Sequence, residues 1–424
     1  MRRYFAIILS LMMIVSAGGC GRASGLFEGN TSQESGTKGT LEDETGLKAG
    51  FLFPSANDAT DTVSHVEGIR RMQKETGLKD SQILIKSKVE KDQYESEIDS
   101  MVEKGCSIIF AKSSDSEKAM MEAAKKYPKV QFCQEDGKNA KKSGLPNYHN
   151  FYVKLYEAYY TAGIAAGMKM NEMLNDGDVS GDSCVIGFAV TRENAENISC
   201  INAFYLGVGE VCSQASMLVR YVGSKDNYDE DGECARQLIA AGAKMMCQRT
   251  YTTAIAAVCA ENDVPLVGSE VNMISSAPNE AITSTTADWS IYYTYAVNAL
   301  KDGEDIDVDW CGGYKERAVY LTQFNDKILA DGTIEKVAEA ERGLRRAKRD
   351  VFDTEKFTVE GDSLANLVKE NDDYKKYKKY IRNGVYQESD KNSAPSMKFL
   401  VDGVSVITGN YLEEDTPEEN TQKE

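Results

Sequence analysis

The amino-acid sequence predicts an α/β protein with two Rossmann-like lobes, each built on a parallel sheet. From Leu47 onward, short apolar runs alternate with amphipathic stretches of helical length. This alternation is typical of βαβ units, whose strands are parallel and whose crossovers are right-handed. The series then repeats with a similar length. Two lobes of ordinary size fit such a repeat better than one very large sheet.

The first series alternates strands and helices from its beginning. Gly77 and Gly105 follow its first two amphipathic stretches. Glycine is common at helix ends because it adopts the left-handed conformation without steric cost. We therefore expect strands at 47–53, 82–85, 107–111 and 130–133, and helices at 63–76, 94–104 and 116–126.

The second series opens with a long predicted helix at 152–174, which contains Gly163 and Gly167. Two glycines on one helix favour close packing against another element. We expect the following strands at 184–190, 217–222, 244–247, 265–268 and 283–286, with helices at 195–211, 230–241 and 253–262. A helix at 291–302, a strand at 319–323 and a helix at 334–348 complete the pattern.

The chain after Glu355 differs from both series. We predict strands at 357–359 and 397–407 in a small accessory sheet, and a frayed acidic tail at 413–424. The run Lys375-Lys376-Tyr377-Lys378-Lys379 forms a basic cluster on a predicted helix. The cluster is either a solvated helix face or a docking surface for a partner.

The first residues have the pattern of a bacterial lipoprotein signal. Two arginines precede an apolar run at 4–17, and small residues lead directly to Cys20. The run is shorter than the roughly 20 residues that span a bilayer, as expected of an export segment. We expect a signal peptide at 1–19, lipidation at Cys20 and a flexible tether at 20–46. The alternatives are an ordinary signal peptide or a retained anchor.

Composition narrows the expected partners. The chain carries 49 Lys and Arg against 67 Asp and Glu, a formal net charge of -18. An acidic surface repels nucleic acid and anionic head groups, so we expect no nucleic-acid partner. The charge also keeps an exposed protein soluble. A soluble domain tethered by lipid to the extracytoplasmic face of the cell membrane is expected to bind something for a membrane partner.

Cysteine and histidine usage disfavours a metal or redox centre. Nine cysteines follow Cys20 and none has CxxC spacing, and the chain has only two histidines, His65 and His149. Zinc sites and thioredoxin-like motifs depend on such spacing. We therefore expect no cofactor and no metal. One or two disulfides remain open, because sequence does not give their connectivity.

The predicted sheets indicate where a ligand would bind. In parallel sheets, ligands lie beyond the carboxyl ends of the strands, where loops converge and helix amino termini present N–H groups. This rule selects loops at 54–61 and 112–115 in the first lobe, and at 191–194, 224–229, 249–253 and 269–272 in the second. From these loops and the return between lobes we select Asp58, Asp61, Ser113, Ser114, Arg192, Tyr251, Glu270, Asn272 and Trp289 as ligand-binding candidates.

Most of these candidates in the first lobe have a structural alternative. Asp58 is expected either to accept hydrogen bonds from the ligand or to cap the following helix. Ser113 and Ser114 are expected to donate to a ring nitrogen or hydroxyl, but Ser114 or Asp115 equally suits a helix cap.

The second-lobe and return candidates also have two interpretations. Tyr251 is expected to stack on a flat ring or to pack at the rim. Glu270 and Asn272 would bind hydroxyl groups or be solvated in their loop. Trp289 would cover the ligand or pack in the hinge. Arg192 would pair with Asp58 on closure, meet an anion, or form a surface salt bridge.

Specific residues give the chain a family resemblance. They include Asp58 seven residues before His65, the run Gly105–Phe110, the helix Tyr156-Glu157-Ala158 with Gly163 and Gly167, the run Asn202-Ala203-Phe204 with Gly207, and Ala277-Pro278 with Trp289. In this order and spacing, residues 47–352 resemble the basic membrane protein family of lipoproteins, which includes purine nucleoside receptors of ABC importers. The chain departs from a common pattern of the family in three places. The family often has an acidic residue at the position of Asn272, an aspartate near Tyr251 and a tryptophan near Lys225.

The resemblance implies a type I periplasmic-binding-protein fold, with two lobes joined by three crossovers and a ligand between them. The implied division is 47–160 plus 288–318 for lobe 1, 161–287 plus 319–352 for lobe 2, and 353–424 for a C-terminal accessory segment. The implied function is capture of a small polar ring compound, a nucleoside or purine, for an ABC permease and ATPase.

Two other classes of function remain open. A nucleoside-processing enzyme is disfavoured, because the sequence shows no carboxylate cluster or serine nucleophile motif. A surface sensor or adhesin would keep the lobes without transport.

Overall fold

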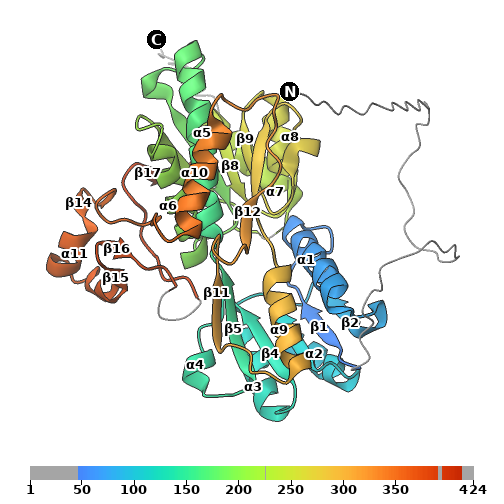
Figure 1. The fold of residues 1–424 in the computed structure, drawn as a ribbon. Coiled ribbons are helices and arrows are strands. Elements are labelled where there is room, and N and C mark those ends of the chain that lie inside the picture. Colours follow the sequence, from blue (N-terminus) through green and yellow to red (C-terminus); the bar gives the residue numbers. More distant parts are fainter. Residues whose placement is uncertain (1–45, 225, 390–393, 413–424) are drawn as a thin grey trace, which may run out of the picture. The chain divides into compact units, whose positions relative to one another are not determined.

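The computed structural model describes residues 46–224, 226–389 and 394–412, all within one compact unit, Leu41–Glu424. Two parallel sheets dominate it (Figure 1). The predicted signal peptide, Cys20, nearly all of the tether and the acidic tail lie outside the described residues. Among the helices that the structure describes, none is both long and apolar enough to cross a bilayer.

The first sheet has six parallel strands in the order β11-β5-β4-β3-β1-β2. Its strands are β1 (Ala49–Leu52), β2 (Ile83–Lys86), β3 (Ile108–Ala111), β4 (Gln131–Glu135), β5 (Tyr148–Val153) and β11 (Asp309–Gly312). The helices of this lobe are α1 (Thr60–Thr76), α2 (Tyr94–Glu103), α3 (Glu117–Lys126), α4 (Ala140–Ser143) and α9 (Ser290–Asp302). Gly77 ends α1 in the predicted left-handed conformation.

The second sheet has seven strands in the order β12-β10-β9-β8-β6-β7-β17, and only β12 runs antiparallel to its neighbour. Its strands are β6 (Val185–Val190), β7 (Ser216–Tyr221), β8 (Met245–Arg249), β9 (Leu266–Ser269), β10 (Ala281–Ala287), β12 (Val319–Leu321) and β17 (Val404–Val406). Its helices are α5 (Leu155–Asp176), α6 (Ala195–Gly209), α7 (Tyr228–Ala240), α8 (Ala254–Glu261) and α10 (Thr333–Arg345).

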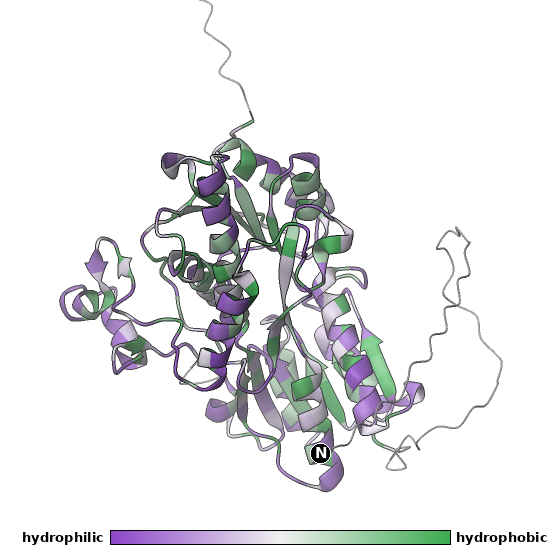
Figure 2. Cartoon of the chain, turned by 45° about the horizontal axis from the view of Figure 1, so that its top comes forward, coloured by the Kyte–Doolittle hydropathy of each residue, from purple (hydrophilic) through white to green (hydrophobic). Residues whose placement is uncertain are grey.

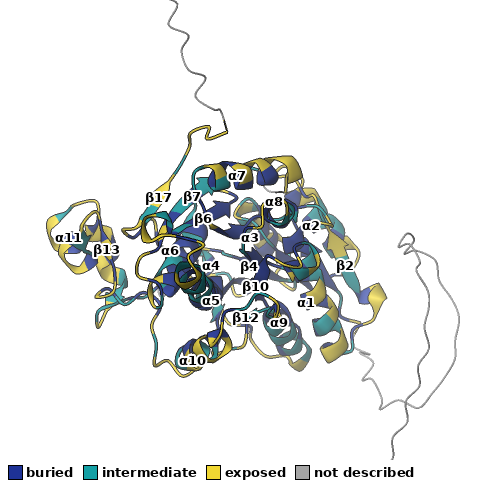
Figure 3. Ribbon diagram, turned by 90° about the horizontal axis from the view of Figure 1, so that it is seen from above, coloured by how far each residue is buried: buried dark blue, intermediate teal, exposed yellow. Residues whose placement is uncertain are grey.

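The chain passes between the two sheets three times. It leaves the first sheet between β5 and α5, returns between β10 and α9, and leaves again between β11 and β12. The predicted α/β architecture with two parallel sheets is confirmed. The central strands of both sheets lie in the buried interior, while the helices present exposed residues outward (Figure 3). The helices carry hydrophilic and hydrophobic residues along their length, as amphipathic helices do (Figure 2).

Close packing of α5 on α6 confirms the interpretation of the two glycines. A Cβ atom at Gly163 would lie 2.1 Å from the carbonyl oxygen of Phe204, and one at Gly167 would lie 2.5 Å from Val211. On the opposite helix, a Cβ atom at Gly207 would lie 2.0 Å from the carbonyl oxygen of Tyr160. The two helix backbones therefore approach so closely that only glycine fits at these positions.

Two strands of the first sheet were not predicted, and one helix was predicted to begin too early. β5 occupies Tyr148–Val153, where the expected helix at 152–174 overlapped its end. All six residues of β5 are buried, so the strand shows no polar alternation. β11 (Asp309–Gly312) was also missed, because its four residues include an aspartate and a glycine, which are poor strand formers.

The strand predicted at 357–359 is confirmed as β13 (Thr358–Val359), but its predicted pairing with a strand at 397–407 is wrong. The region 397–407 contains only β17, which pairs in parallel with β7 at the edge of the second sheet. β13 pairs instead with β14 (Asp362–Ser363), and β15 (Ile381–Arg382) pairs with β16 (Val385–Tyr386), around α11 (Leu364–Glu370). The basic cluster lies on a short 3₁₀ helix, Lys375–Tyr380.

Candidate functional site

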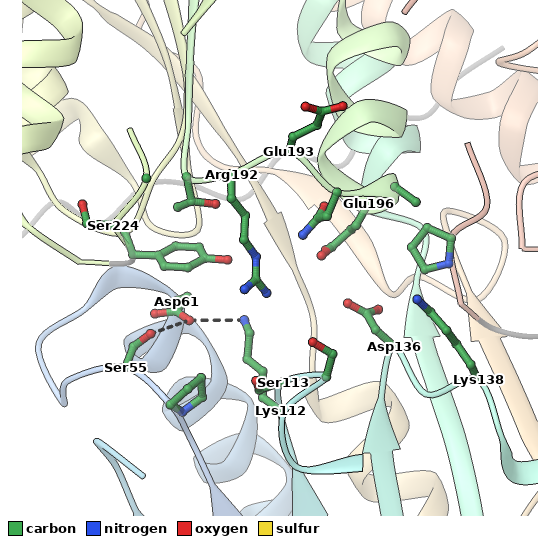
Figure 4. A pocket seen from close by; sticks show the side chains of 18 residues that line it. Ser55, Asp61, Lys112, Ser113, Asp136, Lys138, Arg192, Glu193, Glu196 and Ser224 are labelled. Carbon is green, nitrogen blue, oxygen red and sulfur yellow. Dashed lines mark hydrogen bonds and ion pairs between the residues drawn. The ribbon is translucent and has the colours of Figure 1, made fainter. Parts of the chain in front are cut away.

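A cavity of about 390 Å³ lies between the carboxyl ends of the two sheets. Loops after β1, β3 and β4 line it from the first lobe, and loops after β6, β7 and β8 with the first turn of α6 line it from the second (Figure 4). The cavity therefore lies where the sequence predicts a ligand, beyond the carboxyl ends of the parallel strands. The lining residues are Pro54, Ser55, Asp61, Lys112, Ser113, Ser114, Asp136, Lys138, Thr191, Arg192, Glu193, Asn194, Ala195, Glu196, Gly223, Ser224, Tyr251 and Pro395.

The two lobes touch beside this cavity. The backbone N–H of Ala56 donates to Asp226 Oδ2 at 2.9 Å, and the N–H of Thr60 donates to the carbonyl oxygen of Tyr251 at 2.9 Å. Each contact joins α1 or the loop before it to a second-lobe loop. The cleft in this structure is therefore closed.

Lys112 is the central cation of the first-lobe wall. Its Nζ lies 3.3 Å from Asp61 Oδ2, 3.8 Å from Glu135 Oε1 and 3.2 Å from His65 Nε2. Burial alone would lower the pKa of Lys112, but attraction from Glu135 and Asp61 outweighs burial and raises this pKa well above its ordinary value. Lys112 is therefore charged and neutralises the acidic groups around it.

His65 beneath Lys112 is neutral. Burial, and then repulsion from Lys112, lower its pKa well below the ordinary value. Its Nε2 accepts from Lys112, so its Nδ1 carries the proton and donates to the Tyr293 hydroxyl at 2.7 Å. Glu135 Oε2 lies 3.5 Å from Nε2, but a neutral ring makes no ion pair with it. The imidazole stacks on Trp289, with ring centroids 3.9 Å apart.

Arg249 is the corresponding cation of the second lobe. Its Nε donates to Asn197 Oδ1 at 2.7 Å, its Nη2 pairs with Glu196, and its Nη1 lies 3.5 Å from Glu270 Oε1. Glu270 in turn accepts from Ser64 of α1 at 3.0 Å. This last bond connects the arginine network to the opposite lobe.

Two carboxyl groups face each other across the cleft. Asp136 extends from the end of β4, and Glu196 lies in the first turn of α6 (Figure 4). Burial, then repulsion from Glu196 and Glu135, raise the pKa of Asp136 well above its ordinary value. Burial would also raise the pKa of Glu196, but attraction from Arg249 outweighs burial and lowers it. Asp136 is therefore the protonated partner and can donate to the Glu196 carboxylate.

One polar oxygen of the cavity lining has no partner. Ser224 Oγ is buried and has no hydrogen-bond partner among the residues that the structure describes. Buried polar atoms are rarely left unpaired in native structures. Within the described ranges, no group of three or more His, Cys, Asp or Glu side chains is arranged to hold a metal ion.

The structure brings five of the predicted binding residues to the cavity wall. Asp61, Ser113, Ser114, Arg192 and Tyr251 line it. The Tyr251 ring presents a flat surface whose centroid lies 5.5 Å from Lys112 Nζ. Ser114 does not cap the next helix, since Ser116 occupies the cap position and makes no side-chain cap bond.

Four predicted residues lie away from the cavity lining. Asp58 is exposed in a turn, and the cap position of α1 belongs to Ala59, so neither interpretation of Asp58 describes its position. Asn272 caps a 3₁₀ turn through Ile274 N at 3.0 Å. Glu270 and Trp289 are buried behind the lining, and both contact Ser64.

Sequence reasoning missed the charged residues of the wall. Lys112 and Arg249 lay inside the predicted loops but were not selected among the neighbouring polar residues. Asp136 was missed because β4 was predicted to end at residue 133 and extends to Glu135. Glu196 follows the predicted loop directly and begins α6.

Similar solved structures have the predicted fold. A solute-binding protein of an ABC transporter system from Aeropyrum pernix K1 has a TM-score of 0.61 at 14% identity, covering 76% of this chain and 97% of that chain. A solute-binding protein of an ABC transporter system from Conexibacter woesei DSM 14684 has a TM-score of 0.59 at 16% identity, covering 72% of this chain and 97% of that chain. The type I periplasmic-binding-protein fold is confirmed.

The sequence itself is similar to proteins of one family. It is 24% identical over 309 residues to a purine-binding protein of Brucella abortus (strain 2308). The alignment covers 72% of this chain and 84% of the relative. The model of the Bmp family, described as ABC transporter substrate-binding protein PnrA-like, matches residues 47–345. The chain therefore belongs to the Bmp family of ABC transporter substrate-binding proteins, the basic membrane protein family that its sequence resembles.

Proposed function

We propose that this protein captures a neutral nucleoside or purine base in the closed cleft and delivers it to the permease and ATPase of an ABC importer. The observation that carries the proposal is the cavity between the two sheets, which charged and hydroxyl side chains of both lobes line. Its volume of about 390 Å³ is in the range of small-molecule sites. A purine nucleoside suits such a space better than a peptide or an oligosaccharide.

The charges of the wall favour a neutral ligand over a phosphorylated one. Lys112, Lys138 and Arg192 line the cavity together with four carboxyl groups, those of Asp61, Asp136, Glu193 and Glu196. Lys112 is already paired with Asp61. A nucleotide would bring its phosphate charges toward the carboxylates of Asp61, Glu193 and Glu196, and like charges repel in a buried site. Asp136 is protonated and adds no charge. A nucleoside brings hydroxyl and amino donors instead.

The polar groups of the wall match the hydrogen-bonding groups of a nucleoside. Asp61 and Glu196 offer carboxylate oxygens to ribose hydroxyls or an exocyclic amine, while Ser113 and Ser224 have hydroxyls that both donate and accept. Tyr251 supplies a flat ring on which a base can stack. The purine-binding relative in Brucella abortus supports this ligand class.

A thermal-shift and calorimetry panel tests the proposal. The panel contains adenosine, inosine, guanosine, adenine, adenosine monophosphate and ribose. A true ligand at one hundred times its dissociation constant stabilises the fold by about 2.7 kcal/mol. We expect nucleosides or bases to raise the melting temperature and the monophosphate to have no effect. Chromatography of the recovered ligand checks that it is unchanged, as a receptor requires.

The variant Tyr251→Ala provides the matched test of the cleft, with Tyr228→Ala as the control because Tyr228 is exposed on α7. We expect the first to weaken binding at least tenfold and the second to leave it unchanged. Binding of the monophosphate alone, or of no panel member, would overturn the proposal.

Lipid attachment at Cys20 is the second part of the proposal, and this residue lies outside the described part of the chain. The signal-like sequence before Cys20 supports it. In a bacterial host, Cys20→Ser should abolish incorporation of labelled palmitate. Unchanged labelling would contradict lipidation at this residue.

A further inference from the structure

The chain beyond the family match returns to the ligand cleft. The match ends at residue 345, and we call the described residues after it, 346–389 and 394–412, the C-terminal segment. The segment lies beside α6 (Figure 1). The buried side chain of Asn202 on α6 donates through Nδ2 to the carbonyl oxygen of Phe399 at 2.7 Å and accepts through Oδ1 from Val401 N at 3.1 Å. Both functions of this amide are thus satisfied by the segment.

A buried carboxylate makes the second contact with α6. Glu388 is 5% exposed. Its Oε1 accepts from Ser199 Oγ at 2.6 Å, Ser396 N at 2.8 Å and Met397 N at 3.2 Å, and its Oε2 accepts from Ser396 Oγ at 2.6 Å. Glu388 therefore ties the second turn of α6 to the part of the segment around Ser396.

The contact at Ser199 bears directly on the cavity. Ser199 lies three residues after Glu196, and residues three apart share one face of a helix. Glu196 lines the cavity and pairs with Arg249. On the other side of the contact, Ser396 adjoins Pro395, which also lines the cavity. One hydrogen-bonded unit thus supports a wall residue of the family region and contributes a wall residue of its own.

We propose that the C-terminal segment is a functional part of the ligand cleft, in which Pro395 is a wall residue that limits ligand size and Glu388 is a positioning residue for Glu196. This inference rests on the proposed function only for the identity of the ligand. It assigns to the segment a role in affinity and selectivity that the match at 47–345 does not contain.

The positioning role is tested by three variants and two measurements. Glu388→Ala removes every acceptor at this point, whereas Glu388→Gln keeps an acceptor oxygen of the same reach. Glu360→Ala is the control, because Glu360 accepts from Tyr374 at 3.0 Å inside the segment. We measure the dissociation constant of adenosine by calorimetry, and hydrogen exchange in peptides that cover 194–200.

We expect Glu388→Ala to weaken adenosine binding about tenfold and to speed exchange at 194–200. Glu388→Gln should stay within about threefold of the parent protein, and Glu360→Ala should match it. Unchanged affinity and unchanged exchange in Glu388→Ala would overturn the positioning role while leaving the proposed function intact.

Pro395→Phe tests the wall. An aromatic side chain at this position would fill part of the cavity, so we expect it to weaken binding of adenosine more than binding of adenine, the smaller probe. Equal effects on the two probes would show that Pro395 does not limit ligand size.

A parent protein that binds no member of the panel would refute the proposed function but not this inference. Exchange at 194–200 then decides. Faster exchange in Glu388→Ala, but not in Glu388→Gln or Glu360→Ala, supports the positioning role, and equal exchange in all variants overturns it.

Discussion

At the scale of single residues, the cleft depends on two buried cations. Lys112 balances Asp61 and Glu135 in the first lobe, and Arg249 balances Glu196 and Glu270 in the second. A buried ion pair gains little over an apolar replacement, but removal of one partner leaves an unpaired charge that is costly. The contribution of each cation to stability is therefore measured most clearly in a variant that lacks it.

Lys112→Met keeps the apolar stem and removes the charge. At pH 7 we expect the free energy of unfolding to fall by about 3 kcal/mol, because the buried Asp61 loses its partner. Burial raises the pKa of Glu135 to about 8, so this carboxyl is mostly ionised only above pH 8. The loss should therefore be larger at pH 9, where Glu135 also lacks its cation.

Urea unfolding at both pH values measures the effect. Lys138→Met is the control, since Lys138 also lines the cavity but is exposed. A loss of the same size at pH 7 and pH 9, or a similar loss in the control, would show that charge balance at Lys112 is not the cause.

Asp231 on α7 makes the stability of the second lobe depend on pH. It is fully buried, and burial raises its pKa from 3.8 to about 6 despite a 2.6 Å hydrogen bond from Thr252 Oγ1. Between these pKa values the folded state holds a proton that the unfolded state has released. Stability therefore falls as the pH rises from about 4 to about 6, and the penalty persists above this window.

Asp231→Asn keeps the acceptor for Thr252 and cannot ionise. We expect it to match the parent protein below pH 4 and to exceed it by about 3 kcal/mol at pH 7. Urea unfolding from pH 4 to pH 8 measures both curves. Asp229→Asn, at an exposed position in the same turn, should show no such divergence. Parallel curves for Asp231→Asn would contradict the raised pKa.

The sequence could place the cleft but could not identify all the residues that form it. Strand ends follow from the βα alternation, so the loops with Asp61, Ser113 and Tyr251 were found. Whether a polar residue in such a loop points inward depends on how the loop closes, as the exposed Asp58 shows. Selection of Lys112 requires its three-dimensional neighbours, which come from β4 and α1.

At the scale of elements, sequence patterns were reliable where strands and helices alternate and failed where two apolar elements adjoin. Only Lys154 separates β5 from α5, so the apolar residues of the strand lead almost directly into those of the helix. The position of β17 also could not be predicted, because the sequence of an edge strand does not indicate which sheet it joins. At Gly403, just before β17, a Cβ atom would lie 1.9 Å from the Tyr205 hydroxyl, so glycine permits this approach.

Packing of α5 on α6 gives a sharp test at this scale. Gly163→Ala places a methyl group 2.1 Å from the Phe204 carbonyl oxygen, so one helix must move. We expect a loss of about 3 kcal/mol, at the upper end for overpacked cores. Gly209→Ala, near the end of α6, has open space and should instead stabilise by about 0.5 to 1 kcal/mol through helix propensity. Chemical unfolding measures the stability of both variants. Equal changes in the free energy of unfolding would contradict close packing at Gly163.

At the scale of the whole molecule, the cleft lies between two sheets that are joined by three passages of the chain. Trp289 lies at the second passage, where it stacks on His65 and donates to Ser64 at 3.2 Å. Ser64 also contacts Glu270 of the second lobe. On this side of the cleft, buried side chains thus hold the two lobes together. Across the cavity mouth, by contrast, the contact between Ala56 and Asp226 is exposed. Opening is therefore expected at the mouth, by rotation about the passages.

Asp226 tests this view of closure. Asp226→Ala removes the acceptor that holds Ala56 N at 2.9 Å across the mouth. A hydrogen bond at such a position contributes about 1 kcal/mol, which corresponds to roughly fivefold in affinity. Because the contact forms only after the ligand has entered, the change should appear in the dissociation rate, with the association rate nearly constant. Stopped-flow measurements with adenosine give both rates.

Asp229→Ala removes the same charge from a nearby exposed position and should leave both rates unchanged. A slower association with unchanged dissociation would mean that Asp226 guides the ligand inward and does not latch the closed form.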